Sequence, residues 1–245
     1  MELPSKIVKK QDTNPKTMIV FSQPKMGKTT LMAQLKDNLI IDLEKGTRYV
    51  DAYKVEVNNY KELLEVLKEC IAQKKEGKLK FKYVTIDTVT KLESLIMPKA
   101  IQLYQATPMG KNYTGNDVTT LPNGAGYGFI RKSMDYIAQK LQEIFEYVIF
   151  VGHVKSKSIN KEGSEIEVTD LSLTGKMAQL LPAHVDAVAY LHRDKKNNLM
   201  LDFRGGDSLT AGARPEHLKG QNIQISTTDD DGNITYHWDK IFRKQ

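Results

Sequence analysis

The stretch that decides the fold is Met18-Ile-Val-Phe-Ser-Gln-Pro-Lys-Met-Gly-Lys-Thr-Thr30. It opens with an apolar run typical of a buried strand, passes through a short polar loop and enters a helix whose apolar side carries Leu31, Met32 and Leu35. A strand–loop–helix turn directs several backbone N–H groups at one point, at the positive end of the helix dipole. The stretch therefore predicts a site for a phosphate chain.

The loop ends in the last three residues of the phosphate-binding pattern G-x-x-x-x-G-K-[ST], which are Gly27, Lys28 and Thr29. Gly27 lets the backbone approach the ligand, Lys28 can reach the β- and γ-phosphates, and the Thr29 hydroxyl can ligate magnesium. We predict ATP and Mg²⁺ as cofactors. The nucleotide-binding residues that we expect are Gln23, Pro24, Lys25, Met26, Gly27, Lys28, Thr29 and Thr30.

One position departs from the pattern, because Ser22 stands where the pattern has its first Gly. Ser can replace that Gly only if its φ angle stays negative. This difference bears on the rate of hydrolysis more than on binding. The alternative interpretation is an ordinary strand–loop–helix that happens to contain a Gly-Lys pair.

Size and composition fit one globular domain. The chain has 245 residues and a formal net charge of +6, which is compatible with a polyanionic partner but does not require one. We expect a flexible N-terminal arm over residues 1–16 and a single domain over 17–245, with a C-terminal β extension from about 198. The single cysteine, Cys70, excludes an internal disulfide framework and favours a cytoplasmic location. No apolar run is long enough to span a membrane, so no membrane partner is expected.

The order of elements predicts an α/β fold. The expected strands are 17–22, 38–42, 83–87, 147–151 and 185–191, and the expected helices are 28–37, 59–75, 89–104, 129–144 and 174–182. Such alternation gives right-handed βαβ units, a mainly parallel sheet and helices on both faces. Long loops are expected at 105–128 and 154–168. A small antiparallel appendage is expected from strands at 198–204, 223–227 and 234–238.

Polar residues close several of these strands, at the edge where ligands bind in such sheets. Asp87 ends an apolar strand and is placed to hold the metal together with Thr29. Glu44 follows a neighbouring strand and could activate the attacking water, although it could also be a surface residue paired with Lys45. His153 could sense the γ-phosphate or be a structural histidine. The predicted catalytic residues are therefore Lys28, Glu44 and His153.

The two long loops carry basic and aromatic side chains. Such side chains can follow a single nucleic-acid strand, with Lys and Arg on phosphates and Tyr on bases. The alternative is a solvated lid over the nucleotide, and Glu162, Glu165 and Glu167 dilute the charge of the second loop. The candidate DNA-binding residues are Lys111, Tyr113, Arg131, Lys155 and Lys157.

Together these segments resemble the RecA-like recombinase core of P-loop NTPases. The motifs that carry the resemblance are the phosphate loop, Ile41-Asp-Leu-Glu44, Val84-Thr-Ile-Asp-Thr88 and Ile149-Phe-Val-Gly-His153. More narrowly, the chain is similar to phage RecA-like nucleotide-binding proteins of the AAA type, some of which anneal single strands in recombination. The similarity covers roughly residues 17–220, and its further pieces are Gly152–Lys155, Leu173–Asp186 and Ala211–Arg214.

The resemblance implies a site shared between subunits. It implies that Glu44 is the catalytic glutamate, that His153 is a polar γ-phosphate sensor and that 105–128 and 154–172 are DNA-binding loops. It also implies a homo-oligomeric ring or filament, in which Arg204 or Arg214 of a neighbour completes the ATP site. Single-stranded DNA and a single-strand-binding protein are the implied partners.

Three functions remain open on the sequence. The first is an ATP-dependent, single-stranded-DNA-binding protein of phage recombination or annealing. The second is a DNA-binding module that uses the nucleotide as a switch with little turnover. The third is a small P-loop kinase, which is disfavoured because the long loops lack the clustered arginines of a kinase lid.

Overall fold

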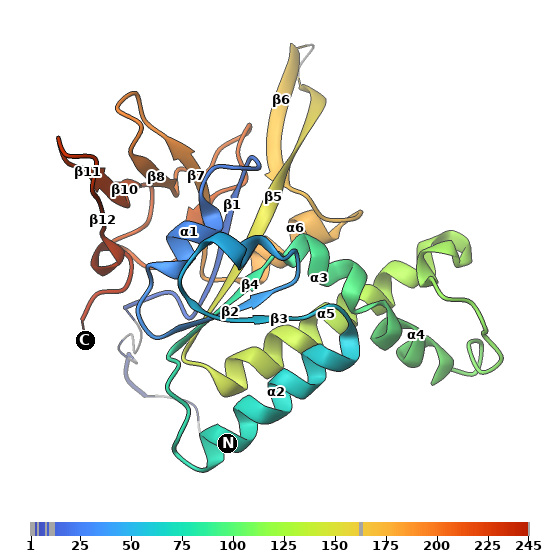
Figure 1. Ribbon diagram of the computed structural model, residues 1–245. Coiled ribbons are helices and arrows are strands. Elements are labelled where there is room, and N and C mark those ends of the chain that lie inside the picture. Colours follow the sequence, from blue (N-terminus) through green and yellow to red (C-terminus); the bar gives the residue numbers. More distant parts are fainter. Residues whose placement is uncertain (1–2, 4, 8, 10–12, 162–163, 245) are drawn as a thin grey trace.

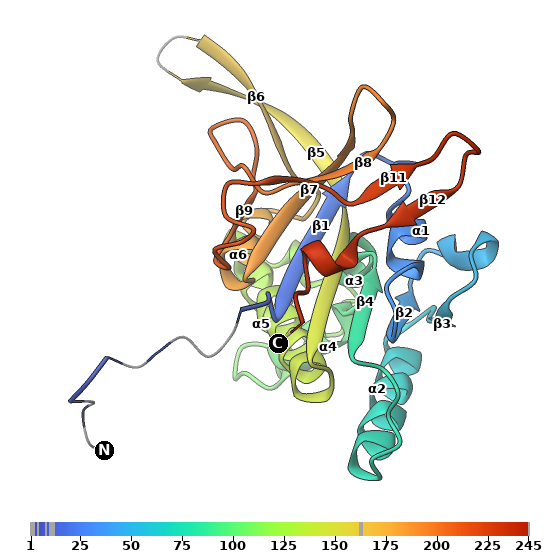
Figure 2. The same cartoon turned by 90° about the vertical axis from the view of Figure 1, so that its left-hand side faces the viewer.

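A computed structural model of the chain describes residues 3, 5–7, 9, 13–161 and 164–244. Its main sheet contains β1 Thr17–Ser22, β2 Asn38–Asp42, β3 Tyr53–Glu56, β4 Tyr83–Asp87, β5 Tyr147–Lys161, β6 Ser164–Leu171, β7 Ala187–Arg193, β8 Leu199–Asp202, β9 Gly212–Ala213 and β10 Asn222–Gln224. The strand order is β10-β8-β7-β1-β5-β4-β2-β3, with β6 beside β5 (Figure 1) and β9 beside β7 (Figure 2). A second, two-stranded sheet pairs β11 Ser226–Thr228 with β12 Ile234–Tyr236.

The middle of the main sheet is parallel. Strand β1 runs parallel to β5 and β7, β4 runs parallel to β5 and β2, and β2 runs parallel to β3, whereas β8, β9 and β10 are antiparallel additions at one side. The helices are α1 Lys28–Ala33, α2 Tyr60–Lys75, α3 Val89–Leu95, α4 Met97–Gln105, α5 Ala125–Ile144 and α6 Met177–His184. Short 3₁₀ turns lie at Gly46–Tyr49, Val118–Thr120, Pro122–Gly124 and Trp238–Lys240.

Two apolar cores lie on opposite faces of the sheet, and β1 contributes to both because its side chains alternate between the faces. Ile19 and Phe21 enter the core that is covered by α2, α3, α5 and α6. Met18 and Val20 enter the second core, which contains Leu31 of α1 and apolar residues of β8. Every residue of β1 is buried, so this strand forms the centre of the molecule.

The C-terminal segment covers the second face beside α1. Trp238, Ile241 and Phe242 are buried there, and Trp238 Nε1 donates a hydrogen bond to the backbone oxygen of Leu31 at 3.2 Å. Figure 2 shows this segment folded back across the sheet near α1. The expected fold class is thus confirmed as a mainly parallel sheet flanked by helices, with a small antiparallel sheet near the C-terminus. Strands β8 and β10 belong to the main sheet.

The expected second loop, 154–168, is wrong. Strand β5 continues to Lys161 and pairs antiparallel with β6, from Val154 opposite Leu171 to Lys161 opposite Ser164. This hairpin stands out from the carboxyl edge of the sheet (Figure 1). The sequence of this hairpin is mostly polar and shows no sustained alternating apolar pattern, so the two strands were not recognised; the buried apolar residues of β6, Val168 and Leu171, lie toward its C-terminal end.

Other boundaries also shifted. Strand β3 was not expected, because its side chains are mostly exposed and it occupies the edge of the sheet. Helix α1 ends at Ala33, earlier than expected, and the helix expected over 89–104 is divided at Ile96 into α3 and α4. Helix α5 begins at Ala125 within the expected first loop.

The first long loop belongs to a separate small unit. Residues 97–131, here called the α4–α5 lobe, comprise α4, two 3₁₀ turns and the beginning of α5. Ala100, Val118 and Ile130 form its small buried core, apart from the two cores of the sheet. The lobe projects sideways beyond α3 (Figure 1).

Candidate functional site

The phosphate loop, residues 22–29, connects β1 to α1 at the carboxyl edge of the sheet. Ser22 is fully buried, and its φ is not positive. Ser22 therefore meets the condition under which Ser can replace the first Gly of the pattern. The loop instead turns at Lys25, with φ of 64°, and at Gly27, with φ of 96°. In the described part of the chain, the backbone N–H groups of residues 25–29 have no protein acceptor. These free donors beside a helix start form a cradle that suits a phosphate chain.

Lys28 lies across this cradle. Its Nζ donates to the Ser22 hydroxyl at 3.0 Å, to the Gln23 carbonyl at 3.0 Å and to the Ser22 carbonyl at 3.3 Å. Burial lowers the pKa of the ammonium, and the charges of Asp87 and Glu44 oppose that shift. A phosphate would exchange these neutral acceptors for anionic oxygens, which bind an ammonium more strongly.

Thr29 and Asp87 meet as predicted. The Thr29 hydroxyl donates to Asp87 Oδ2 at 2.6 Å. Burial raises the pKa of Asp87; the nearby charges of Asp42 and Glu44 add to the rise, while the Thr29 hydrogen bond and Lys28 oppose it. A hydroxyl and a carboxylate in contact beside a phosphate cradle are the oxygen ligands that Mg²⁺ takes together with phosphates. The residues present therefore fit this cofactor.

Glu44 is held in place by Thr88, which directly follows β4, and by His153 of β5. Its Oε1 accepts a hydrogen bond from the Thr88 hydroxyl at 2.6 Å, and its Oε2 lies 3.1 Å from His153 Nε2. Asp42 fixes the backbone below it by accepting from Glu44 N at 2.9 Å. Burial opposes ionisation of Asp42, but hydrogen bonds from Thr47 and from the Glu44 and Gly46 amides hold its pKa below the usual value. The carboxylate of Glu44 is thus aimed from a rigid turn.

His153 follows Gly152 on β5 and points its Nε2 at Glu44. Its Nδ1 is buried and has no hydrogen-bond partner. A proton on Nδ1 would be unsatisfied there, so the neutral tautomer with its proton on Nε2 fits the site. In this form the ring donates to Glu44. The structure therefore places His153 beside the predicted base, and its backbone N contacts the Thr90 hydroxyl at 3.5 Å.

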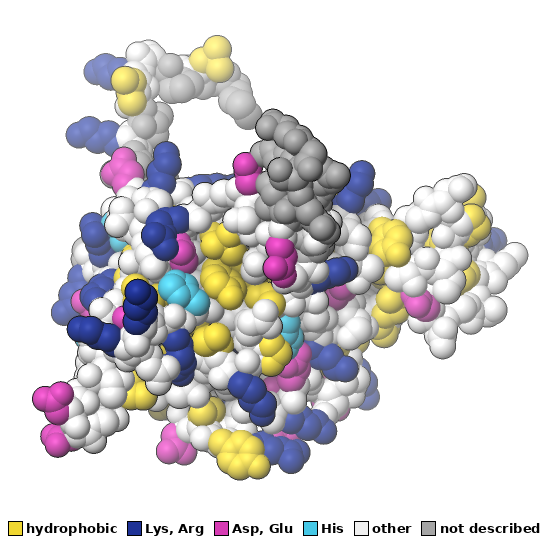
Figure 3. All heavy atoms as spheres, turned by 90° about the horizontal axis from the view of Figure 1, so that it is seen from above, with side chains coloured by type: hydrophobic (Ala, Val, Ile, Leu, Met, Phe, Trp, Pro, Cys, Tyr) yellow, Lys and Arg dark blue, Asp and Glu magenta, His cyan; other side chains and the backbone are white. Residues whose placement is uncertain are grey.

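Three candidate DNA-binding residues lie on the α4–α5 lobe, away from the phosphate loop. Lys111 and Arg131 are exposed. Tyr113 contributes to the lobe itself: its ring packs edge-on against Tyr104, and its hydroxyl donates to the Asp117 carbonyl at 2.6 Å. In Figure 3, which looks down on the carboxyl edge, the lobe shows few charged side chains.

The other two candidates lie on the hairpin. Lys155 is exposed on β5, two residues beyond His153. The backbone of Lys157 also belongs to β5, whereas its side chain lies outside the described part of the structure. Lys and Arg side chains are spread around much of this face outside the lobe (Figure 3). The DNA-binding role of all five residues stays a prediction.

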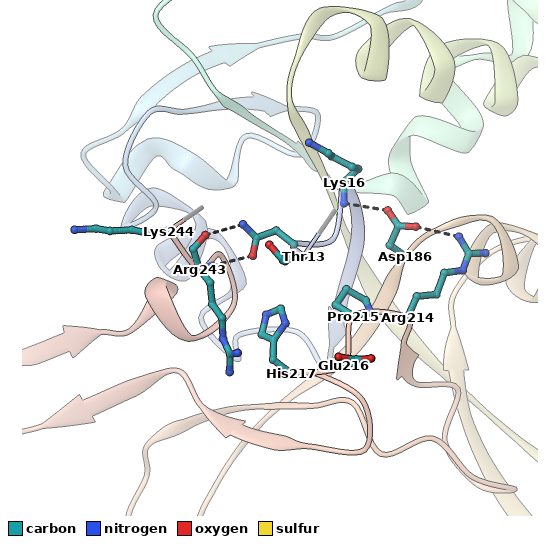
Figure 4. A pocket seen from close by; sticks show the side chains of 10 residues that line it. Thr13, Lys16, Asp186, Arg214, Pro215, Glu216, His217, Arg243 and Lys244 are labelled. Atoms are coloured by element: carbon teal, nitrogen blue, oxygen red, sulfur yellow. Dashed lines mark hydrogen bonds and ion pairs between the residues drawn. The ribbon is translucent and has the colours of Figure 1, made fainter. Parts of the chain in front are cut away.

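The two candidate trans-acting arginines do not reach the phosphate loop of their own chain. Arg204 pairs with Asp202 through its Nη2 at 2.7 Å and its Nε at 3.0 Å. Arg214 pairs with Asp186 at 3.0 Å. It lines a cavity of about 400 Å³ at the start of β1, the opposite edge of the sheet (Figure 4). Their predicted role across a subunit interface stays a prediction.

Sequence reasoning missed three residues near the site. Asp42 ends a buried strand just as Asp87 does, which could have singled it out. Thr88 occupies the N-cap of α3, and its hydroxyl also donates to Glu44. A Thr directly before a helix is a signal for the N-cap role, but not for the bond to Glu44. Arg193 lies beside the phosphate loop, and no sequence pattern indicates this position.

Neither a cluster of metal-binding side chains nor a membrane-spanning helix occurs in the part of the chain that the structure describes. Among the described residues, no group of three or more His, Cys, Asp or Glu side chains could hold a metal ion. A magnesium ion would therefore depend on phosphate oxygens in addition to Thr29 and Asp87. No helix in the described ranges is both long and apolar enough to cross a membrane.

Comparison with known proteins agrees with this geometry. No curated protein matches the chain by sequence. A family profile described as an AAA domain, AAA_24, matches residues 14–215, which is most of the chain. This match covers the phosphate loop, Glu44, Asp87 and His153, and it indicates nucleotide binding or hydrolysis by a P-loop domain. The chain therefore belongs to the AAA domain family AAA_24.

Proposed function

We propose that this protein binds ATP with Mg²⁺, hydrolyses it slowly and couples hydrolysis to single-stranded DNA. One observation carries the enzymatic part. Glu44 lies at the same strand edge as the Thr29–Asp87 pair, and its carboxylate is held at both oxygens. A fixed carboxylate beyond the metal ligands is what in-line attack of water on a γ-phosphate needs.

Each group has a distinct role in this proposal. The free N–H groups of residues 25–29 and the Lys28 ammonium bind and orient the phosphates. Thr29 and Asp87 hold Mg²⁺, which neutralises charge that develops on the phosphate oxygens. Glu44 orients the attacking water and accepts its proton. His153 donates to Glu44 and keeps the carboxylate pointing at that water.

The DNA part is supported by a cavity beside the same residues. A cavity of about 450 Å³ is lined by Thr90 of α3, by Lys155 of the hairpin and by the loop Ser172–Gly175. Glu93 ties this loop to α3, since its carboxylate accepts from Thr174 N at 3.1 Å and from the Thr174 hydroxyl at 2.8 Å. A strand bound against Lys155 would push on the elements that place His153. The state of the DNA could thereby reach Glu44.

The wider role follows from the sequence resemblance. We infer that the protein acts in phage DNA recombination or annealing, as a homo-oligomeric ring or filament, with a single-strand-binding protein as a further partner. Arg204 or Arg214 is the residue that a neighbouring subunit would contribute to the ATP site.

ATP hydrolysis with and without single-stranded DNA tests the proposal. The matched variants are Lys28→Ala and Lys68→Ala, since Lys68 is an exposed lysine on α2 outside the site. We expect wild type and Lys68→Ala to hydrolyse ATP faster with DNA, and Lys28→Ala to lose both binding and turnover.

Other results would redirect the proposal. Hydrolysis that DNA does not change, together with no DNA binding in the presence of ATP, would overturn the DNA-coupled part. ATP-dependent DNA binding with no measurable turnover would instead establish the nucleotide as an assembly switch.

A further inference from the structure

Arg193 reaches the phosphate loop through sheet pairing. It is the last residue of β7, which runs parallel to β1 with Tyr190 opposite Phe21. Parallel neighbours end at the same edge of a sheet. Arg193 therefore emerges beside the phosphate loop, although 165 residues separate it from Lys28 in the sequence.

The guanidinium lies close to Gly27. A methyl group placed on Gly27 would lie 3.7 Å from Arg193 Nη2. The other terminal nitrogen, Nη1, donates to the Asn197 carbonyl at 2.7 Å. Asp194 stiffens this turn by accepting hydrogen bonds from Lys196 N at 2.8 Å and Asn198 N at 2.9 Å. One nitrogen thus anchors the side chain while the other faces the loop.

No carboxylate neutralises Arg193. In the described ranges no Asp or Glu oxygen lies within ion-pair distance of its guanidinium, whereas Arg204 and Arg214 are both paired. The Tyr236 phenol, which is uncharged, is a further neighbour: burial raises its pKa, and the charge of Arg193 opposes the rise. An exposed, unpaired guanidinium beside unsatisfied backbone N–H groups extends the positive field of the cradle.

From this juxtaposition we propose that Arg193 binds the phosphate chain of the nucleotide held by its own subunit. The inference rests on the nucleotide-binding part of the proposed function and extends it by one residue. The ligand class is a nucleoside di- or triphosphate, since the planar guanidinium fork fits two phosphate oxygens. The subunit thereby supplies an arginine in cis, independently of any neighbour.

Binding of ADP, ATP and inorganic pyrophosphate to the full chain tests this role. The variants are Arg193→Gln and Arg193→Lys, and Lys196→Gln is the control that removes one positive charge from the same turn. We expect Arg193→Gln to weaken binding of all three ligands about ten- to hundredfold, as for loss of a charge-assisted hydrogen bond. Arg193→Lys should recover part of the affinity, and Lys196→Gln should match wild type.

A mixing experiment separates cis from trans action. Lys28→Ala and Arg193→Gln chains are combined, and ATP turnover is measured across protein concentrations. If Arg193 acts within its own subunit, the mixture shows only the summed activities of its components. Recovery above that sum would show that Arg193 completes a neighbour's site, and it would overturn the inference.

The failures of the two proposals are distinguishable. If Lys28→Ala abolishes nucleotide binding while Arg193→Gln and Lys196→Gln both match wild type, the proposed function stands and the role of Arg193 falls. Thermal unfolding without nucleotide, compared for Arg193→Gln and Lys196→Gln, detects a folding defect. If Arg193→Gln lowers the unfolding temperature but binds the three ligands like wild type at a temperature where both proteins are fully folded, Arg193 is structural and the inference is overturned.

Discussion

The nucleotide site and the α4–α5 lobe are built in different ways. The polar side chains of the site stand at the ends of β1, β2 and β4 and at His153, where β5 ends its pairing with β1; the apolar residues of these strands are buried on both faces of the sheet. The lobe is attached outside these strands and has its own small core around Ala100, Val118 and Ile130. Packing therefore fixes the geometry of the site more firmly than the orientation of the lobe.

This difference suggests a division of labour. Hydrolysis requires side chains held within a fraction of an ångström, which a packed sheet provides. Recognition of a flexible polymer tolerates a unit that shifts as a body. Damage to the lobe should therefore leave nucleotide binding intact, and damage to the site should leave the lobe folded.

The largest effect is expected for Glu44→Gln. The amide keeps an oxygen that can accept from Thr88 but cannot take a proton from water, so turnover should fall about a hundred- to thousandfold. ATP affinity and the melting temperature should stay near wild type. Single-turnover hydrolysis and equilibrium binding measure the two quantities, with the exposed Glu65→Gln as control. An equal loss of binding and turnover would contradict a role in the chemical step.

Gly126→Ala should damage the lobe selectively. A Cβ at this position would lie 1.6 Å from the Val118 carbonyl oxygen, so the lobe must open, at a cost of about 1–3 kcal/mol or more. In the same helix a Cβ at Gly128 meets nothing within 4 Å, so Gly128→Ala should be neutral or stabilising by up to about 1 kcal/mol.

Hydrogen exchange measures the stability of the lobe in these two variants, and ATP binding measures the integrity of the site. We expect faster exchange in residues 97–131 of Gly126→Ala, lost stimulation by DNA and unchanged ATP affinity. Loss of ATP affinity in Gly126→Ala would show that the lobe and the site are not separable.

A smaller effect is expected for His153→Ala, which removes the donor to Glu44 Oε2. Turnover should fall about tenfold with little change in ATP affinity, because the carboxylate keeps its bond to Thr88. In His153→Gln the amide can still donate, so part of the rate should return. If Gln and Ala variants are equally slow, the hydrogen bond to Glu44 is not what His153 contributes.

The smallest effect concerns stability without ligand. The pKa of Asp87 is raised in the folded state, so its ionised form is less favourable there than in the unfolded chain. The penalty is absent below the unfolded pKa and builds as pH rises through that value towards the folded one. Asp87→Asn can keep the Thr29 hydrogen bond and should raise the melting temperature by a few degrees at pH 7.

Acidification sharpens that test. The advantage of Asp87→Asn over wild type should shrink as the pH approaches about 4, where Asp is protonated in the unfolded chain as well. Mg²⁺ with ATP should stabilise wild type more than the variant. Thermal melts with and without ligand measure both differences, and a less stable variant at pH 7 would contradict the pKa argument.

The sequence predicted the fold class and the position of the site because both depend on local signals. The apolar strand before Ser22, the Gly-Lys-Thr run and the acidic ends of β2 and β4 can each be recognised from a few consecutive residues. The rule that parallel strands end together then places Glu44 and Asp87 near the phosphate loop. In the structure the Thr29 hydroxyl contacts Asp87, and Glu44 contacts Thr88 and His153; the catalytic roles of these residues stay a prediction.

The rest could not be predicted because it depends on contacts between distant segments. Beyond His153, β5 pairs with β6, and the mostly polar sequence of this hairpin has no sustained alternating apolar pattern, so the segment resembled a loop. The role of Tyr113 inside the lobe depends on packing against Tyr104. Arg193 approaches Gly27 only because β7 pairs with β1. No motif or residue spacing in the sequence indicates that these two residues are neighbours.

The packing of the C-terminal segment has a spectroscopic consequence. Trp238 is the single tryptophan of the chain; it is buried and bonded to the backbone of Leu31, in the helix that begins with Lys28. All indole emission from the native protein therefore originates one helical turn from the phosphate loop. Tryptophan fluorescence of the unlabelled protein, measured during titration with a nucleotide, therefore tests whether binding changes the packing of this segment against α1.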